Sequence, residues 1–138
     1  MPQTTVVFYK EGDGQVPVLA WLRALQRRDR RAYAACIARI QRLAVMGHEL
    51  RRPEADYLRD GIYELRARRG RVQYRILYFF HGQLLAVLAH ALTKEGQVPP
   101  TDIERALRRK DAFVQDPENH SYAEELQNGK DDRRTQNP

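Results

Sequence analysis

Alternation of apolar and polar residues marks several short segments of the chain and predicts β-strands. The run TTVVFY at residues 4–9 is β-branched and aromatic, which is typical of a first strand. Three further segments follow one another: IYELRAR at 62–68, VQYRILYFF at 72–80 and QLLAVLAHALT at 83–93, separated by turns that contain glycine. The last of these is almost continuously apolar, which indicates a central strand. Residues 62–93 therefore predict a three-stranded meander.

The other apolar segments repeat at the spacing of an α-helix. A first helix is expected to begin at Pro17, because proline is tolerated at the first helical position. A second helix is expected to end before Gly47, a natural C-terminal cap. A last helix follows a Pro-Pro pair, where Thr101 and Glu104 match a capping box. Residues 48–60 contain a proline, alternate little and are predicted to form a loop.

This order of elements predicts an α+β fold. The N-terminal strand and an αα-hairpin are expected to pack on a small, mainly antiparallel four-stranded sheet, followed by a short C-terminal helix. The first strand is placed at the sheet edge, and the helix pair covers one face and leaves the other open. Residues 1–115 are expected to form one domain. Residues 116–138 are polar, and we expect most of this tail to be mobile because it buries too little apolar surface.

The net charge of the chain indicates what kind of partner it binds. The chain has a net charge of +6, and most of its basic residues are arginines, whose planar fork matches phosphate oxygens. A polyanionic partner is therefore favoured, although ordinary soluble proteins are sometimes arginine-rich too. The single cysteine, Cys36, excludes an intrachain disulfide and suits a reducing compartment. No apolar run approaches the roughly 20 residues of a membrane span, and the start lacks a signal-peptide pattern, so a cytoplasmic protein without membrane contact is expected.

Strand alternation assigns several basic residues to one sheet face. In the strand at 62–68, Arg66 and Arg68 lie opposite the apolar set that should meet the helices. If Arg75 on the next strand also points to the open side, the three arginines form a cluster. Arg71, at the turn, and Lys94, after the last strand, could join it. Such a face could hold a phosphate backbone, and the alternative is an ordinary solvated sheet face.

Several segments of the sequence resemble a known protein superfamily. The segments GIYELRARRGRVQYRILYFF, HALTKEGQVPP and TDIERA are similar to the RelE/HigB toxin superfamily, in particular to its phage-derived HigB-like branch. The resemblance covers roughly residues 4–113. It implies a RelE-like fold and the toxin of a type II toxin–antitoxin system, an endoribonuclease that cleaves mRNA on the ribosome. It also implies that no metal or cofactor is needed, and that a cognate antitoxin, often of the helix-turn-helix type, neutralises the toxin.

The resemblance also suggests residue roles in cleavage by the ribose 2′-OH. Arg75 matches the most recurrent arginine of the family and is expected to stabilise the phosphorane. Arg66 matches a basic position on the preceding strand and could neutralise phosphate or lower the pKa of a neighbour. Lys94 matches the basic residue at the end of the last strand and could contact phosphate.

Three further candidates each have two interpretations. His90 could act as a general acid or base, or could be a hydrogen-bonded core residue. Glu64 could act as a base, or pair with the neighbouring arginines. Tyr78 could stack on a base, or belong to the core. Arg68 and Arg71 are expected to bind RNA together with Glu64 and Tyr78. The spacing of histidines and the single cysteine predict no metal site.

The chain departs from the branch at Glu95, where a second lysine is common, and this removes one positive charge. Leu92 stands where the branch often has an aromatic residue. Two other functions stay open: a ParE-like inhibitor of DNA gyrase with the same fold, and a degenerate toxin that binds RNA or protein without catalysis. An acidic or amphipathic antitoxin segment is expected to bind the exposed sheet edge or the basic face.

Overall fold

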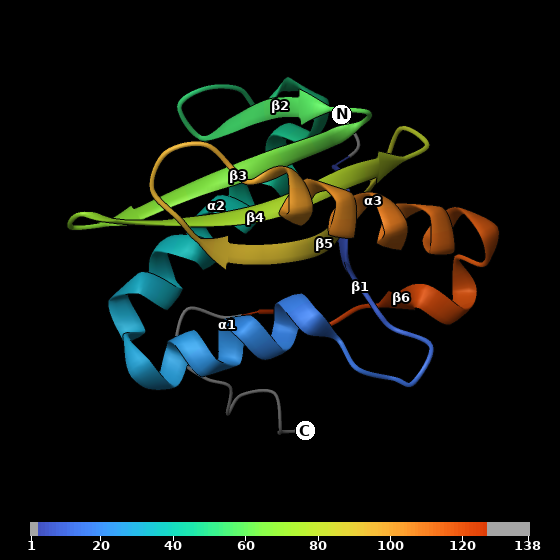
Figure 1. Ribbon diagram of the computed structural model, residues 1–138, viewed down its shortest axis with the longest axis horizontal. Coiled ribbons are helices and arrows are strands. Elements are labelled where there is room, and N and C mark those ends of the chain that lie inside the picture. The colour runs from blue at the N-terminus through green and yellow to red at the C-terminus, as the bar shows by residue number, and fades with distance from the viewer. Residues whose placement is uncertain (1–2, 127–138) are drawn as a thin grey trace.

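The computed structural model describes residues 3–126 and is built around one mixed sheet with the strand order β2-β3-β4-β5-β1-β6 (Figure 1). The strands are β1 (Thr5–Tyr9), β2 (Ala55–Arg59), β3 (Ile62–Arg69), β4 (Val72–His81), β5 (Leu85–Thr93) and β6 (Ser121–Tyr122). The helices are α1 (Pro17–Arg28), α2 (Arg30–Met46) and α3 (Pro100–Gln115), with short 3-10 turns at Gly47–Glu49 and Glu118–His120. The predicted α+β class is confirmed, as are the N-terminal strand, the helix pair, the antiparallel β3-β4-β5 meander and the C-terminal helix.

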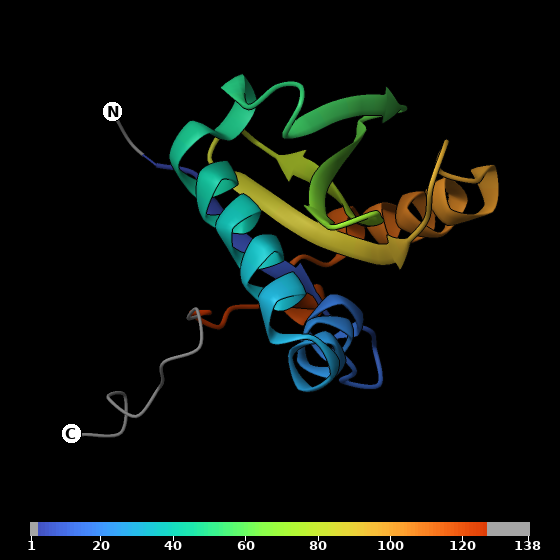
Figure 2. The ribbon, with the colours of Figure 1, turned by 90° about the vertical axis from the view of Figure 1, so that its left-hand side faces the viewer.

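Helices lie on both sides of the sheet, which corrects the prediction of an open face. Figure 2 shows α2 on one side and α3 on the other. The side facing α3 carries Ile62, Leu77 and Phe79, which are fully buried and need an apolar cover. Ile103 and Phe113 of α3 belong to the same buried cluster. Alternation of β3 and β4 therefore produces a second core on the face that also bears the arginines.

The sheet is wider than predicted. Residues 55–59 form β2, an edge strand paired with β3, in the segment predicted to be a loop. Its five residues, ADYLR, show weak alternation, so pairing with β3 decides their conformation. β1 does not simply end the sheet: it pairs in parallel with β5, and β6 pairs with its other side at Phe8 and Tyr9.

Two of the three predicted features at helix ends are correct and one is wrong. Pro17 opens α1 at the first helical position, and Gly47 caps α2 with a φ of 55°, as predicted. The capping box of Thr101 and Glu104 is wrong, because α3 already begins at Pro100. Pro100 has no backbone N–H, so the first position of α3 needs no side chain to accept a hydrogen bond from it.

Part of the predicted tail is folded. Residues 118–122 form a 3-10 turn and β6, and His120 stacks on Tyr9 with 5.3 Å between ring centroids. The Nδ1 of His120 donates to the carbonyl oxygen of Lys10 at 2.8 Å. These contacts anchor a polar segment that lacks a hydrophobic core of its own. Residues 127–138 of the predicted mobile tail lie outside the described residues. Within residues 3–126, no helix combines the length and apolar character needed to cross a bilayer.

The turn at Gly47 offers a test of the packing between α2 and the start of β1. Its φ of 55° and ψ of −127° suit glycine, and an added Cβ would collide with the Thr4 hydroxyl. We expect Gly47→Ala to lower the free energy of unfolding by about 2–4 kcal/mol in urea titrations. The control Gly82→Ala has a φ of 67° but open space around the new Cβ, and should cost only about 1–2 kcal/mol. Equal losses in the two variants would contradict the collision.

Candidate functional site

Rows of side chains cross β3, β4 and β5 on the sheet side that faces α3. Strand register aligns residues that share this face, since directly opposed residues point the same way. The rows are Glu64–Leu77–His90, Arg66–Arg75–Leu92 and Arg68–Gln73–Lys94, the last extended by a backbone hydrogen bond from the Lys94 N–H to the Gln73 carbonyl at 3.2 Å. The predicted cluster of Arg66, Arg68 and Arg75 is therefore brought together on one face, and Lys94 joins it at the end of β5.

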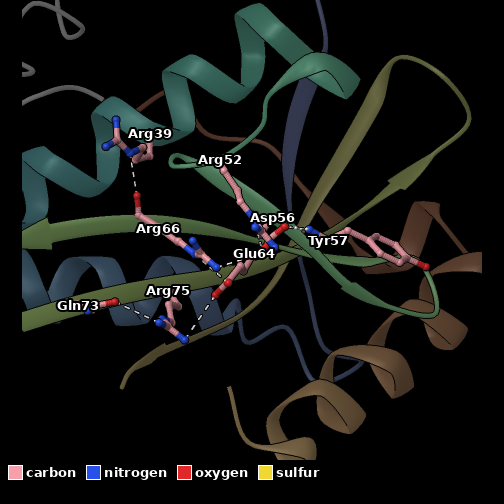
Figure 3. A network of polar contacts seen from close by, with 8 residues as sticks. All are labelled: Arg39, Arg52, Asp56, Tyr57, Glu64, Arg66, Gln73 and Arg75. Carbon is pink, nitrogen blue, oxygen red and sulfur yellow. Dashed lines mark hydrogen bonds and ion pairs between the residues drawn. The ribbon is translucent and has the colours of Figure 1, made fainter. Parts of the chain in front are cut away.

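A carboxylate lies at the centre of the cluster (Figure 3). Glu64 Oε2 accepts a hydrogen bond from Arg66 Nε at 2.9 Å, and Glu64 Oε1 lies 3.7 Å from Arg75 Nη1. Arg75 also donates from Nη2 to Gln73 Oε1 at 3.1 Å. Glu64 is 2% exposed and Arg75 7%, so this is a buried ion pair. Glu64 thus makes the pairing that was one of its two interpretations, and a role as a base stays a prediction.

Two polar atoms in this cluster lack a hydrogen-bond partner in the part of the chain that the structure describes. Within residues 3–126, neither Glu64 Oε1 nor Arg75 Nε makes a hydrogen bond, although both are buried. The 3.7 Å separation between Glu64 Oε1 and Arg75 Nη1 is too long for a hydrogen bond. A buried donor or acceptor without a partner costs about 1–3 kcal/mol. The paired Glu64 and Arg75 side chains therefore hold one unused acceptor and one unused donor, which a hydroxyl group and a phosphate would satisfy.

The cluster extends to β2 through Asp56, which sequence reasoning missed because residues 48–60 were predicted to be a loop. Asp56 Oδ2 lies 3.1 Å from Arg66 Nη2 and also 3.1 Å from Arg52 Nε. The hydrogen bond from Arg52, helped by the nearby Arg66 charge, lowers the pKa of Asp56 below its usual value. The carboxylate stays ionised at neutral pH and holds both guanidinium groups in place. The only sequence signal for this contact is the i, i+4 spacing of Arg52 and Asp56.

His90 belongs to a separate network with α3. Its Nε2 donates to Asp102 Oδ1 at 2.6 Å, and its Nδ1 lies 3.4 Å from Arg109 Nη1, which also donates to the Ala89 carbonyl at 2.7 Å. Burial lowers the pKa of His90 and outweighs the opposite effect of Asp102. The ring is therefore neutral at pH 7, with Nε2 protonated and Nδ1 accepting. Both ring nitrogens are engaged, and β3 and β5 are two strand spacings, about 10 Å, apart, so His90 does not touch Glu64.

The remaining predicted residues fall in different places. Arg68, Arg71 and Lys94 are exposed, and their side chains make no hydrogen bond or ion pair within the described part of the chain. Tyr78 lies on the opposite face from Arg75, fully buried under α1 and α2, so it does not join the cluster. Its register position on β4, next to Leu77, requires this by alternation. Cys36 is a core residue as predicted, and burial raises the pKa of its thiol to about 12.

A model of a protein family described as "Phage derived protein Gp49-like (DUF891)" matches residues 20–111, more than half of the chain. The chain belongs to the Gp49-like family. This family is part of the RelE/HigB-like toxin grouping. No curated protein matches the chain. The matched range holds the whole arginine cluster with Glu64 and Asp56, and also the His90 network on α3. β1 and β6 lie outside it.

The His90 network of this Gp49-like protein predicts acid sensitivity. Burial holds the folded-state pKa of His90 below the ordinary value of about 6.5, so the unfolded chain binds this proton more tightly. The stability is fully present above about pH 6.5 and is lost as the pH falls toward the folded-state pKa. We expect His90→Gln to flatten the decrease in unfolding free energy between about pH 7.5 and pH 5, measured by urea titration. The control His48→Gln, at an exposed position, should retain it. An unchanged slope in His90→Gln would assign the acid loss to other groups.

Proposed function

We propose that this Gp49-like protein is the toxin of a type II toxin–antitoxin system and an endoribonuclease that cleaves mRNA on the ribosome. One observation carries the proposal: Glu64 and Arg75 hold an unused acceptor and an unused donor in one cluster with Arg66. Exposed Arg68 and Lys94 adjoin this cluster on the same face. The combination suits a phosphodiester with a neighbouring hydroxyl. Membership of a toxin grouping gives independent support.

The proposed reaction uses the ribose 2′-OH as the nucleophile. The 2′-oxygen attacks the adjacent phosphorus, the bond from phosphorus to the 5′-oxygen breaks, and the products are a 2′,3′-cyclic phosphate and a 5′-OH. Glu64 Oε1 accepts the 2′-OH proton, while Arg75 and Arg66 offset the charge that develops on the phosphorane oxygens. The leaving 5′-oxygen takes a proton, for which Lys94 is the exposed candidate. In this scheme a base, a cation and an acid all come from one sheet face, and no metal or cofactor takes part.

Burial sets the order of contacts. The Arg75 side chain is 8% exposed and that of Arg66 is 35% exposed. RNA therefore first meets Arg66, Arg68, Arg71 and Lys94, and its phosphate reaches Arg75 only when the side chains that bury Arg75 move. His90 takes part as an acid or base only if Arg109 releases its Nδ1. Tyr78 has no place in this scheme because it lies on the other face.

The same proposal includes the partners and the place of action. The protein works in the cytoplasm, on mRNA in the ribosome, and a cognate antitoxin of the helix-turn-helix type neutralises it. An acidic antitoxin segment fits the exposed arginines by charge. A second candidate is a binding module without catalysis, which the enclosure of Glu64 and the exposed Glu95 beside Lys94 favour. A gyrase inhibitor with this fold is the third outcome that experiment must separate.

The test is expression in a bacterial host with growth curves and mapping of mRNA 5′ ends, followed by cleavage rates of purified protein in a translation extract. Wild type should arrest growth and create new 5′ ends. Arg75→Ala should lower the cleavage rate by about 10²–10³-fold, because it removes a donor to the developing charge. Lys94→Ala should lower it by about 10²-fold or more, the lower end of the range for a proton-transfer group.

Controls separate a loss of catalysis from a loss of folding or of positive charge. Arg75→Ala leaves buried Glu64 with one cation fewer and is therefore expected to destabilise the protein, so its fold must be checked by circular dichroism. Lys94 is exposed and should be replaced without such a cost. Arg27→Ala removes an exposed charge from α1, on the opposite side of the sheet, and should cleave like wild type. Growth arrest with intact mRNA would contradict nuclease action, and supercoiling inhibition would then identify a gyrase inhibitor. No arrest at good expression would favour the binding module.

A further inference from the structure

A pocket of about 440 Å³ lies at the β2 edge of the sheet, beside the arginine cluster. Its lining includes aromatic rings and charged groups: His48, Arg51, Arg52, Asp56, Tyr57 and Tyr63. Leu50 and Ala55 form an apolar floor that belongs to the core under α2. The proposed cleavage chemistry uses none of these residues, so the pocket needs its own explanation.

Aromatic rings form a continuous run along this pocket. Tyr57 meets Tyr63 edge-on at 5.0 Å between centroids, Tyr63 meets Phe80 at 5.3 Å, and His48 stacks on Phe80 at 3.6 Å. Tyr63 and Phe80 also pack against the core, so core packing explains them. Tyr57 is different, because it is 53% exposed. Its hydroxyl accepts a hydrogen bond from the Gly61 N–H at 3.0 Å, which fixes the ring at the surface.

The pocket shares a wall with the arginine cluster. Asp56 lines the pocket, and its Oδ2 holds Arg52 of the pocket and Arg66 of the cluster at the same distance of 3.1 Å. Figure 3 shows Arg52 and Asp56 beside Glu64 and Arg66, with the Tyr57 ring extending away from them. Tyr57 pairs with Tyr63 and therefore lies on the α2 side of the sheet, whereas Asp56 pairs with Glu64 on the side of the arginine cluster. Because β2 is the edge strand, RNA whose backbone lies on the cluster can pass around this edge and place an adjacent base in the pocket.

We propose that this pocket binds a nucleobase of single-stranded RNA whose backbone lies on the arginine cluster. Tyr57 offers a pre-set ring on which a base stacks, the contact that single-stranded RNA uses most often. Arg51 is exposed, its side chain makes no hydrogen bond or ion pair within residues 3–126, and its guanidinium group supplies donors for a base edge. The inference rests on the proposed function, since it takes RNA to be the substrate, and it assigns to the β2 edge the choice of base next to the cut.

The experiment measures binding without cleavage. Fluorescein-labelled hexamers of 2′-O-methyl RNA cannot be cut by 2′-OH attack, and their affinity for the full-length chain is read by fluorescence anisotropy. We expect Tyr57→Ala to raise the Kd about 5- to 150-fold, as expected for the loss of one base–aromatic stack. Tyr57→Phe keeps the ring and should bind within about twofold of wild type, because hydroxyl loss leaves stacking intact. An abasic nucleotide at one position should weaken wild type and have no effect on Tyr57→Ala.

A matched control is Val114→Ala, which trims an exposed apolar side chain of α3 that is also 53% exposed. It should bind the hexamers as wild type does. If Tyr57→Ala binds as tightly as wild type, or if wild type binds none of the hexamers, the nucleobase pocket is overturned. The translation-extract assay then tests mRNA cleavage independently, because its readout depends on neither hexamer affinity nor the Tyr57 variants. If binding depends on Tyr57 but mRNA stays intact, the pocket stands and the nuclease proposal falls.

Discussion

The buried pair of Glu64 and Arg75 is the constraint on which the arrangement of the site depends. Taking two charges out of water costs several kcal/mol for each ion, and the pair is stable only with good geometry and further hydrogen bonds. Arg66 and Gln73 supply those bonds. The pair therefore also holds the side chains of Arg66 on β3 and Gln73 on β4 in place. Among residues 3–126 it leaves Glu64 Oε1 and Arg75 Nε without a hydrogen bond, and the proposed ligand would use these two atoms.

One sheet face performs two tasks because its composition changes along the strands. At one end Ile62, Leu77 and Phe79 are apolar and pack against α3. At the other end Arg66, Arg75 and Lys94 follow on the same alternation. The apolar end anchors the helix, and the helix in turn carries Asp102 and Arg109 to His90. At the charged end Arg68 and Lys94 are exposed, whereas Arg75 is buried beside Glu64.

Much of this was predictable from local patterns. Alternation identified β3, β4 and β5 and assigned Arg66 and Arg68 to one face, with Arg75 joining them only if it pointed the same way. The register of β3 and β4 shows that it does. The position of α3 was missed, although Leu77 and Phe79 share the face of Arg75 and already indicated a second cover. β2 and Asp56 were missed because an edge strand with weak alternation depends on its neighbour rather than on its own sequence. The partners of His90 come from α3, and no spacing rule predicts contacts between such distant segments.

The location of the titratable groups limits which chemistry the cluster can support. His90, the usual choice for proton transfer near neutral pH, is neutral and engaged at both nitrogens, about two strand spacings from Glu64. Proton transfer in the cluster therefore falls to a carboxylate and an ammonium group. In the proposed reaction Arg66 turns from Glu64 toward phosphate, which frees Glu64 Oε2 from its hydrogen bond. On this proposal, the arrival of RNA opens the carboxylate for the 2′-OH, and no histidine is needed.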